Sequence, residues 1–182
     1  MEILESDYYY HIYNRGNGKV NLFVNEDNYY YFLSLMRKYI LPVADIYAYC
    51  LLPNHFHFLI RIKDDVQNPS QAFSNYFNAY SKAFNKQEKR SGSLFQRPFK
   101  RIKIDTEDYL RSLLVYIHCN SEIHGITADF SKYIYSSYQT YFSNSPTSIK
   151  REVGIGWFND LENFKFMHEN KVFHLKEVFL LE

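Results

Sequence analysis

The order in which hydrophobic residues change their spacing constrains the fold of this chain more than any other feature. Residues 8–14 are rich in β-forming side chains and lead into Arg15-Gly16-Asn17-Gly18, which predicts a strand followed by a turn. A helix comes next, with Asn25 as the expected N-cap and Pro42 as its stop. Its apolar positions recur at spacings of three and four residues: Phe32, Leu35, Met36, Tyr39 and Ile40.

The later segments complete a recognisable order of strands and helices. Leu52-Pro53-Asn54 separates two strands and predicts a tight antiparallel connection. The last helix has Thr106 as its cap and should reach about Asn120. Strands are predicted at residues 43–51, 55–62 and 99–104. Helices are predicted at residues 70–90 and 106–120. The complete order, β-α-β-β-α-β-α, is the ferredoxin-like split βαβ pattern: an α+β fold with one antiparallel sheet and helices mainly on one face.

The length of 182 residues suits one domain with a small C-terminal appendage. The sheet and its helices occupy residues 1–142, a polar linker occupies residues 143–148, and the tail is residues 149–182. The tail cannot form a core alone, and Val172–Leu181 is an ambiguous element that could add a strand to a sheet edge. We expect the tail to pack on the core or on a partner, and the short linker favours its own chain. The side chains that need burial are Trp157, Phe158, Leu161, Phe164 and Phe173.

Basic residues concentrate in one segment of a nearly neutral chain. The formal net charge is +1, but residues 82–103 carry eight basic side chains and one acidic side chain. Such a run is usually a solvated helix face, but here it is interleaved with Phe84, Leu94, Phe95 and Phe99. That mixture is typical of a groove that binds a polyanion. The aromatic content of 19% would also suit stacking on unpaired bases, although tyrosine-rich strands pack well as ordinary sheet.

Cysteine spacing and the absence of long apolar runs indicate the compartment. Cys50 and Cys119 are isolated, so neither a disulfide framework nor a thiolate zinc site is predicted. The N-terminus lacks a basic start followed by an apolar run, and no stretch approaches the length of a membrane span. We therefore expect a cytoplasmic protein with no membrane partner.

Two histidines share one face of a predicted strand. In residues 55–60, successive side chains alternate between faces, so Phe56 and Phe58 point one way and His55 and His57 point the other. Two neutral imidazoles at this spacing can bind one divalent ion. A lone His-x-His is more often a packed or surface pair, so the pattern needs support from elsewhere in the chain.

That support comes from the last predicted helix. Tyr116 and Asn120 are four residues apart and therefore lie on one helical face. A phenol one turn before an amide oxygen could supply a nucleophile and a third ligand suited to Mg²⁺ or Mn²⁺. In a chain with 18 tyrosines this spacing alone would carry no weight.

Several ordered motifs resemble those of one family. They are His11 to Gly18, Ala48 to Ile60 with its Pro-Asn-His-Phe-His core, Gly92 to Lys100, Tyr109-Leu110, Tyr116 to Asn120 and Tyr135 to Tyr138. Together they resemble the HUH-type single-tyrosine transposases, in particular the REP-associated tyrosine transposases, along most of residues 1–142. The chain departs from the family at Ser121, where proline is usual, and at Ile134-Tyr135, where Pro-Trp is usual. These departures affect what can be inferred about the DNA substrate, and not what the resemblance implies about the chemistry.

The resemblance implies a function and a set of site residues. Tyr116 would be the nucleophile, and His55, His57 and Asn120 would bind Mg²⁺ or Mn²⁺. The enzyme would be a transposase that nicks single-stranded DNA near hairpins of repetitive palindromic elements, forms a 5′-phosphotyrosine intermediate and rejoins strands without ATP. It would act as a monomer or homodimer, with Tyr116 serving its own subunit or a partner's. The alternatives are a domesticated hairpin-binding or regulatory protein, and a replication initiator or relaxase-type nickase.

DNA contacts are expected from the basic segment, with about half of its cations touching phosphate. Phe95 is predicted to be an exposed ring that stacks on a base. His11 is interpreted as structural, whereas His118, His124, His168 and His174 have no partner at ligand spacing and are expected at the surface. The cationic candidates are Arg15, Lys82, Lys86, Lys89, Arg90, Arg97, Lys100, Arg101 and Lys103.

Overall fold

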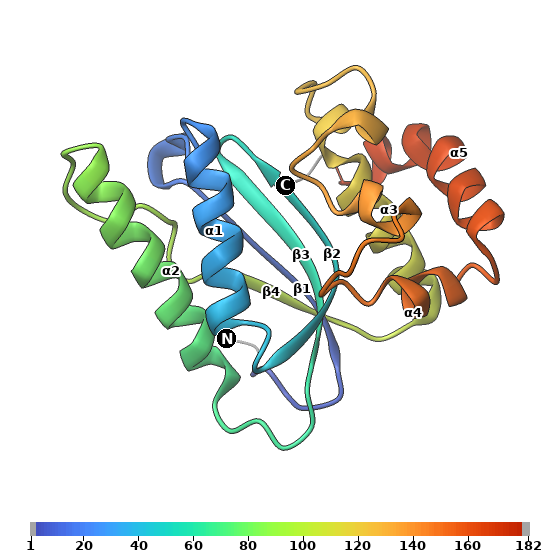
Figure 1. Ribbon diagram of the computed structural model, residues 1–182, viewed down its shortest axis with the longest axis horizontal. Helices are drawn as coiled ribbons and strands as arrows, with labels where there is room; N and C mark the ends of the chain where they lie inside the picture. Colours follow the sequence, from blue (N-terminus) through green and yellow to red (C-terminus); the bar gives the residue numbers. More distant parts are fainter. Residues whose placement is uncertain (1–2, 180–182) are drawn as a thin grey trace.

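A four-stranded antiparallel sheet organises the structure, a computed structural model that describes the backbone of residues 3–179 and side chains as far as Asn170 (Figure 1). The strands lie in the order β2-β3-β1-β4. The first and the last strand of the chain, β1 and β4, are therefore neighbours in the sheet. This order agrees with the ferredoxin-like α+β fold expected from the sequence. The strand bounds are β1 Tyr9–Arg15, β2 Ala44–Leu52, β3 His55–Ile62 and β4 Lys100–Ile104.

Two of the helices begin where the sequence provides caps. The side chain of Asn25 accepts a hydrogen bond from the backbone N–H of Asn28, and Thr106 accepts one from that of Tyr109. Each predicted helix is present with ends shifted by a few residues. The helices are α1 Glu26–Tyr39, α2 Pro69–Gln87, α3 Glu107–Ile123, α4 Arg151–Gly156 and α5 Leu161–Phe179, with short 3-10 turns η1 Asn17–Lys19, η2 Phe130–Lys132 and η3 Tyr138–Phe142.

The two faces of the sheet are covered by different helices (Figure 1). α1 and α2 cover the face to which Phe56 points, since the ring of Phe56 lies 5.2 Å from that of Phe32 in α1 and 5.5 Å from that of Phe77 in α2. α3 covers the other face, where its Tyr116 ring lies 5.6 Å from the His57 ring of β3. As expected, α1 and α2 lie on the same face of the sheet. The helix α3 lies on the opposite face.

The segment after residue 148 packs against the same chain. Ile149 forms a bridge with Ile46, and the Trp157 ring stacks 4.9 Å from that of Tyr47. Phe164 is fully buried, with its ring 4.6 Å from that of Tyr141. α5 is helical to Phe179, so Val172–Leu181 does not add a strand over that range, and residues 180–182 lie outside the described residues. The side chains of Phe173 and His174 also lie outside them.

Two histidines expected at the surface are instead fully buried between α3 and α5. His168 Nδ1 donates to the Phe164 carbonyl oxygen at 2.7 Å, so its Nε2 accepts from His118 Nδ1 at 2.9 Å. His118 Nε2 then accepts from the Ser137 hydroxyl at 2.8 Å. The surface expectation for His118 and His168 was wrong because no local spacing reveals partners 50 residues apart. In the described part of the chain, no helix is both long enough and apolar enough to cross a membrane.

Candidate functional site

A polar cavity of about 450 Å³ opens beside the histidines of β3. The tight β2–β3 connection places Asn54 at its rim, and strand alternation turns His55 and His57 toward it. Strand β1, η1, the segment around the start of β4 and the C-terminal end of α3 contribute the remaining walls. The residues that line the cavity are Tyr13, Asn14, Arg15, Lys19, Asn54, His55, His57, Gln96, Lys100 and His124.

Hydrogen bonds define the orientation of both imidazoles. His55 Nδ1 lies 2.6 Å from Asn54 Oδ1, and because an amide oxygen can only accept, Nδ1 carries the proton. His55 Nε2 is then the nitrogen with a lone pair. His57 Nδ1 lies 2.8 Å from Nε2 of His11, a buried residue of β1. In His57, Nε2 is therefore the ring nitrogen that His11 does not contact.

Burial keeps both imidazoles neutral at pH 7. The pKa of His55 is lowered to about 4, mainly by burial; nearby His124 and Arg15 contribute to the lowering, and Asn120 acts in the opposite direction. Burial also lowers the pKa of His57 well below its ordinary value, and neighbouring histidines add to this effect. Neutral imidazoles are the form that binds divalent ions.

α3 carries Tyr116 and Asn120 to the same histidines. The Tyr116 ring meets the His57 ring edge-on at 5.6 Å. Asn120 lies close enough to His55 to influence its pKa, but neither of its amide atoms forms a hydrogen bond of ordinary geometry, and both are buried. A buried amide with no partner is costly, and a metal ligand role would account for it. Tyr116 is 0% exposed and does not line the cavity.

His124 is a member of the site that the sequence interpretation missed. It is the C-cap residue of α3, four positions after Asn120, and its backbone N–H donates to the Asn120 carbonyl oxygen. Its ring meets the His55 ring edge-on at 4.6 Å. His124 is exposed, as expected, and it lines the cavity. Its partner is His55 of β3, which is far away in the sequence and could not be identified from residue spacing. Within residues 3–170, no group of three or more His, Cys, Asp or Glu side chains could hold a metal ion.

The structure gathers some of the predicted cations at the cavity. Arg15 and Lys100 line it, together with Lys19, which the sequence interpretation missed. A second cavity of about 540 Å³ is lined by Arg97 and Arg101, and it shares Asn14 and Gln96 with the first. The two cavities therefore adjoin along the segment that precedes β4.

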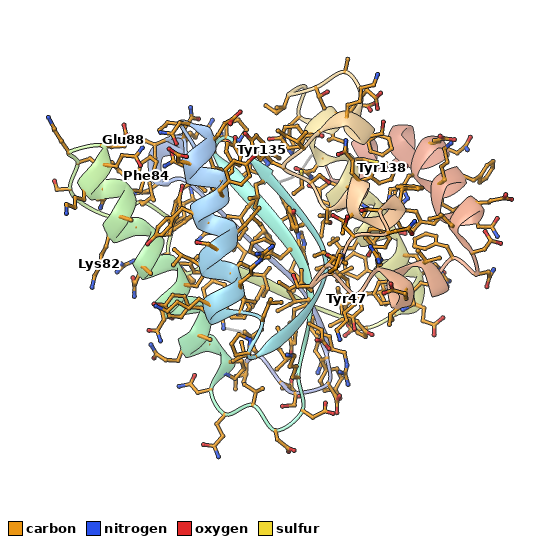
Figure 2. The ribbon with its side chains drawn as sticks, in the orientation of Figure 1. Tyr47, Lys82, Phe84, Glu88, Tyr135 and Tyr138 are labelled. Carbon is orange, nitrogen blue, oxygen red and sulfur yellow. The ribbon has the colours of Figure 1, made fainter. Side chains whose placement is uncertain are left out.

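Other predicted cations lie elsewhere. Lys82, Lys86 and Lys89 are exposed on or just after α2, on the opposite face of the sheet from α3, and Lys82 projects away from the sheet (Figure 2). Lys103 pairs with Glu5 at 3.1 Å. Arg90 donates to the Asn85 side chain at 3.2 Å. These side chains do not converge on Tyr116.

The prediction that Phe95 is an exposed stacking ring was wrong. Phe95 is only 5% exposed, and its ring lies 5.3 Å from that of Phe77 in the core. The loop that carries Phe95 pairs with the end of β1, where Gln96 N–H donates to the Arg15 carbonyl oxygen. This pairing holds the ring beneath α2. Exposed rings occur instead on α1, at Tyr30 and Tyr31.

Comparisons with known proteins agree with this arrangement. The family model described as "Transposase IS200 like" matches residues 5–120, a range that includes β1 and ends at Asn120. One solved structure, of a REP-associated tyrosine transposase bound to a REP hairpin, is similar to this chain with a TM-score of 0.63. The two chains are 18% identical, and the similarity covers 80% of this chain and 86% of that one, which establishes likeness of fold. No curated protein sequence matches.

Proposed function

The chain belongs to the family of IS200-like transposases, and we propose that it nicks single-stranded DNA beside a hairpin and rejoins strands, with Tyr116 as the nucleophile. One observation carries the proposal: the Tyr116 ring lies 5.6 Å from His57, and Asn120 follows one helical turn later. The hairpin is proposed because the similar solved structure is described as bound to one. Since Tyr116 approaches a histidine of its own chain, the arrangement also supports action in cis.

We propose that His55, His57 and Asn120 hold one Mg²⁺ or Mn²⁺ ion. Two imidazole nitrogens and one amide oxygen form an acceptable donor set for these ions. The buried, unpaired amide of Asn120 and the Nδ1 proton of His55 both fit this role. When bound, such an ion polarises a phosphate and stabilises negative charge on its oxygens.

The reaction itself would be carried by Tyr116. Its hydroxyl oxygen forms a bond to phosphorus, the bond from phosphorus to the 3′ oxygen breaks, and the phenolic proton is ultimately transferred to the departing 3′ hydroxyl. The 5′ phosphate remains attached to Tyr116 as an ester. A second 3′ hydroxyl can then run the same exchange in reverse and join the strands without ATP.

The burial of Tyr116 adds a requirement to this mechanism. Because the side chain is 0% exposed, a phosphate can reach the hydroxyl oxygen only after the side chain turns or α3 shifts. Arg15, Lys19 and Lys100 surround the adjoining cavity and would attract the DNA backbone. Arg97 and Arg101 would extend this path through the second cavity.

A covalent-adduct assay tests the proposal. Purified protein is incubated with Mg²⁺ or Mn²⁺ and a hairpin-bearing single strand, and denaturing gels reveal a protein–DNA adduct. Tyr116→Phe is expected to bind DNA and form no adduct, because it lacks the attacking oxygen. Tyr109→Phe, on the same helix, serves as a control that loses one hydroxyl and keeps the adduct. Adduct formation by Tyr116→Phe would refute the assignment.

The same assay separates the alternatives. A domesticated hairpin-binding protein would bind the strand without forming an adduct under any metal condition. A replication initiator or relaxase-type nickase would form the adduct on strands without a hairpin. Cleavage that persists in EDTA would exclude the proposed metal ion.

A further inference from the structure

We propose that His11 is a positioning residue that keeps the proton of His57 on Nδ1 and the lone pair on Nε2, the nitrogen that would bind a metal ion; this inference rests on the function proposed above. The hydrogen bond between His57 Nδ1 and His11 Nε2 is 2.8 Å long and buried. His11 does not line the cavity, so it acts on the site through His57.

The sheet register creates this contact. His11 of β1 pairs directly with Leu59 of β3, and Tyr13 pairs with His57. His11 and His57 are therefore diagonal neighbours on the same face, a separation that two imidazoles can span. The Tyr13 ring stacks on both, 4.6 Å from His11 and 5.6 Å from His57. These contacts restrict the rotation of the His57 ring.

The direction of the hydrogen bond decides which His57 nitrogen can bind a metal. One proton lies between the two neutral rings. If His57 Nδ1 donates it to His11 Nε2, then His57 Nε2 carries a lone pair. If His11 donates instead, the proton of His57 lies on Nε2 and blocks it as a ligand. We assign the first arrangement, in which His11 carries its own proton on Nδ1.

Burying the imidazole of His11 destabilises the fold, which favours a functional reason for a histidine at this position. Its side chain is 1% exposed, and Nδ1 is buried without a hydrogen-bond partner among the described residues. An apolar residue of similar size would avoid this unpaired atom. The imidazole supplies what an apolar residue cannot, an acceptor for His57 Nδ1, and outer-shell acceptors of this kind orient metal-binding histidines.

The fold also offers a matched control. His168 forms the equivalent buried bond to His118, with Nε2 lying 2.9 Å from Nδ1, between α3 and α5. Neither ring lines the cavity. Replacing His168 removes a buried imidazole acceptor from another histidine without touching His57.

The first experiment measures Mn²⁺ binding without DNA, by electron paramagnetic resonance of the free ion, in His11→Phe, His11→Gln and His168→Phe. His11→Phe is expected to weaken Mn²⁺ binding about 10-fold to 100-fold. His11→Gln, whose amide oxygen can accept the same hydrogen bond, should restore most of the affinity. His168→Phe should keep the wild-type affinity even though it destabilises the protein. Wild-type affinity in His11→Phe would overturn the proposal.

The second experiment needs neither metal nor a variant. Nitrogen-15 NMR of the wild-type imidazoles is expected to find the His57 proton on Nδ1, and a proton on Nε2 would overturn the proposal even if His11→Phe failed to fold. Failure of the parent function has a different signature. If the wild-type protein binds no Mn²⁺ while His57 has the expected tautomer, the metal site is wrong. If Mn²⁺ binding depends on His11 but no DNA adduct forms, the nuclease function is wrong.

Discussion

At the scale of single residues, the site is marked by buried polar atoms whose partners are incomplete. Asn120 has two buried amide atoms that form no hydrogen bond with the described residues, and His11 has one such nitrogen. Both residues lie next to the histidines of β3. Native structures leave few buried polar atoms unpaired, so these atoms next to the histidines are consistent with a site that gains partners from a ligand.

Replacing Asn120 should separate stability from function. Asn120→Leu removes two unpaired polar atoms while keeping a similar volume, so we expect the free energy of unfolding in EDTA to rise by about 1–2 kcal/mol. The same variant should bind Mn²⁺ weakly and form no DNA adduct. Chemical denaturation and the adduct assay check the two parts. A variant that is stabilised and still forms the adduct would remove Asn120 from the site.

At the scale of secondary-structure elements, α3 is held between the sheet and α5. His118 faces α5 through His168, while Tyr116 faces β3 through His57. The polar chain from Phe164 through both histidines to Ser137 links α3 to α5 and to the segment before η3. The helix that carries the proposed nucleophile is therefore packed on both sides.

The burial of His168 predicts acid sensitivity of this contact. Burial lowers its pKa in the folded protein to about 3, whereas the unfolded chain binds the proton near pH 6.5. Stability from the neutral ring is complete above pH 6.5 and is lost as the pH falls toward 3. The slope is at most about 1.4 kcal/mol per pH unit for one histidine. Urea unfolding between pH 7.5 and pH 4 should show a shallower decline for His168→Phe than for the wild type, and equal slopes would contradict this account.

The lysine at the start of β4 leads to a prediction about the salt dependence of DNA binding. Lys100 at the start of β4 lines the cavity, and neutralising one phosphate on a single strand contributes about −0.7 to the slope of log affinity against log salt. Lys100→Gln should therefore make the slope shallower by about 0.7. Lys38→Gln, an exposed lysine of α1 on the other face, should leave the slope unchanged. Fluorescence anisotropy with a hairpin strand measures both, and an unchanged slope for Lys100→Gln would exclude that contact.

At the scale of the whole molecule, residues 149–170 complete the layer around α3. Trp157, Phe158 and Phe164 bury aromatic surface against the sheet and the 3-10 turns, with Trp157 closest to Tyr47 of β2. Each buried aromatic side chain contributes about 1.5–3 kcal/mol. We propose that this tail is part of the folded unit and not a separate domain.

Deleting residues 149–182 tests the role of the tail. The loss of two buried phenylalanine side chains and of the partly buried Trp157 should lower the melting temperature by about 10 °C or more. Because the contacts lie within one chain, light scattering should give the same number of subunits before and after deletion. A change from dimer to monomer would instead assign the tail to assembly.

The secondary-structure elements and the local faces of the site follow from the amino-acid sequence alone. The alternation within β3 placed His55 and His57 together, and helical spacing placed Tyr116 with Asn120, because both patterns depend only on residues a few positions apart. For the same reason, the caps at Asn25 and Thr106 and the order of strands and helices were predictable.

The contacts between these strands and helices depend on the tertiary structure. It placed α3 on the histidine face of the sheet, brought His11 to His57 through the register of β1 with β3, and set His124 against His55. It also buried Phe95 beneath α2 and joined His118 to His168. Each of these contacts joins residues far apart in the chain, and their formation depends on how whole elements pack, a choice that no local spacing specifies.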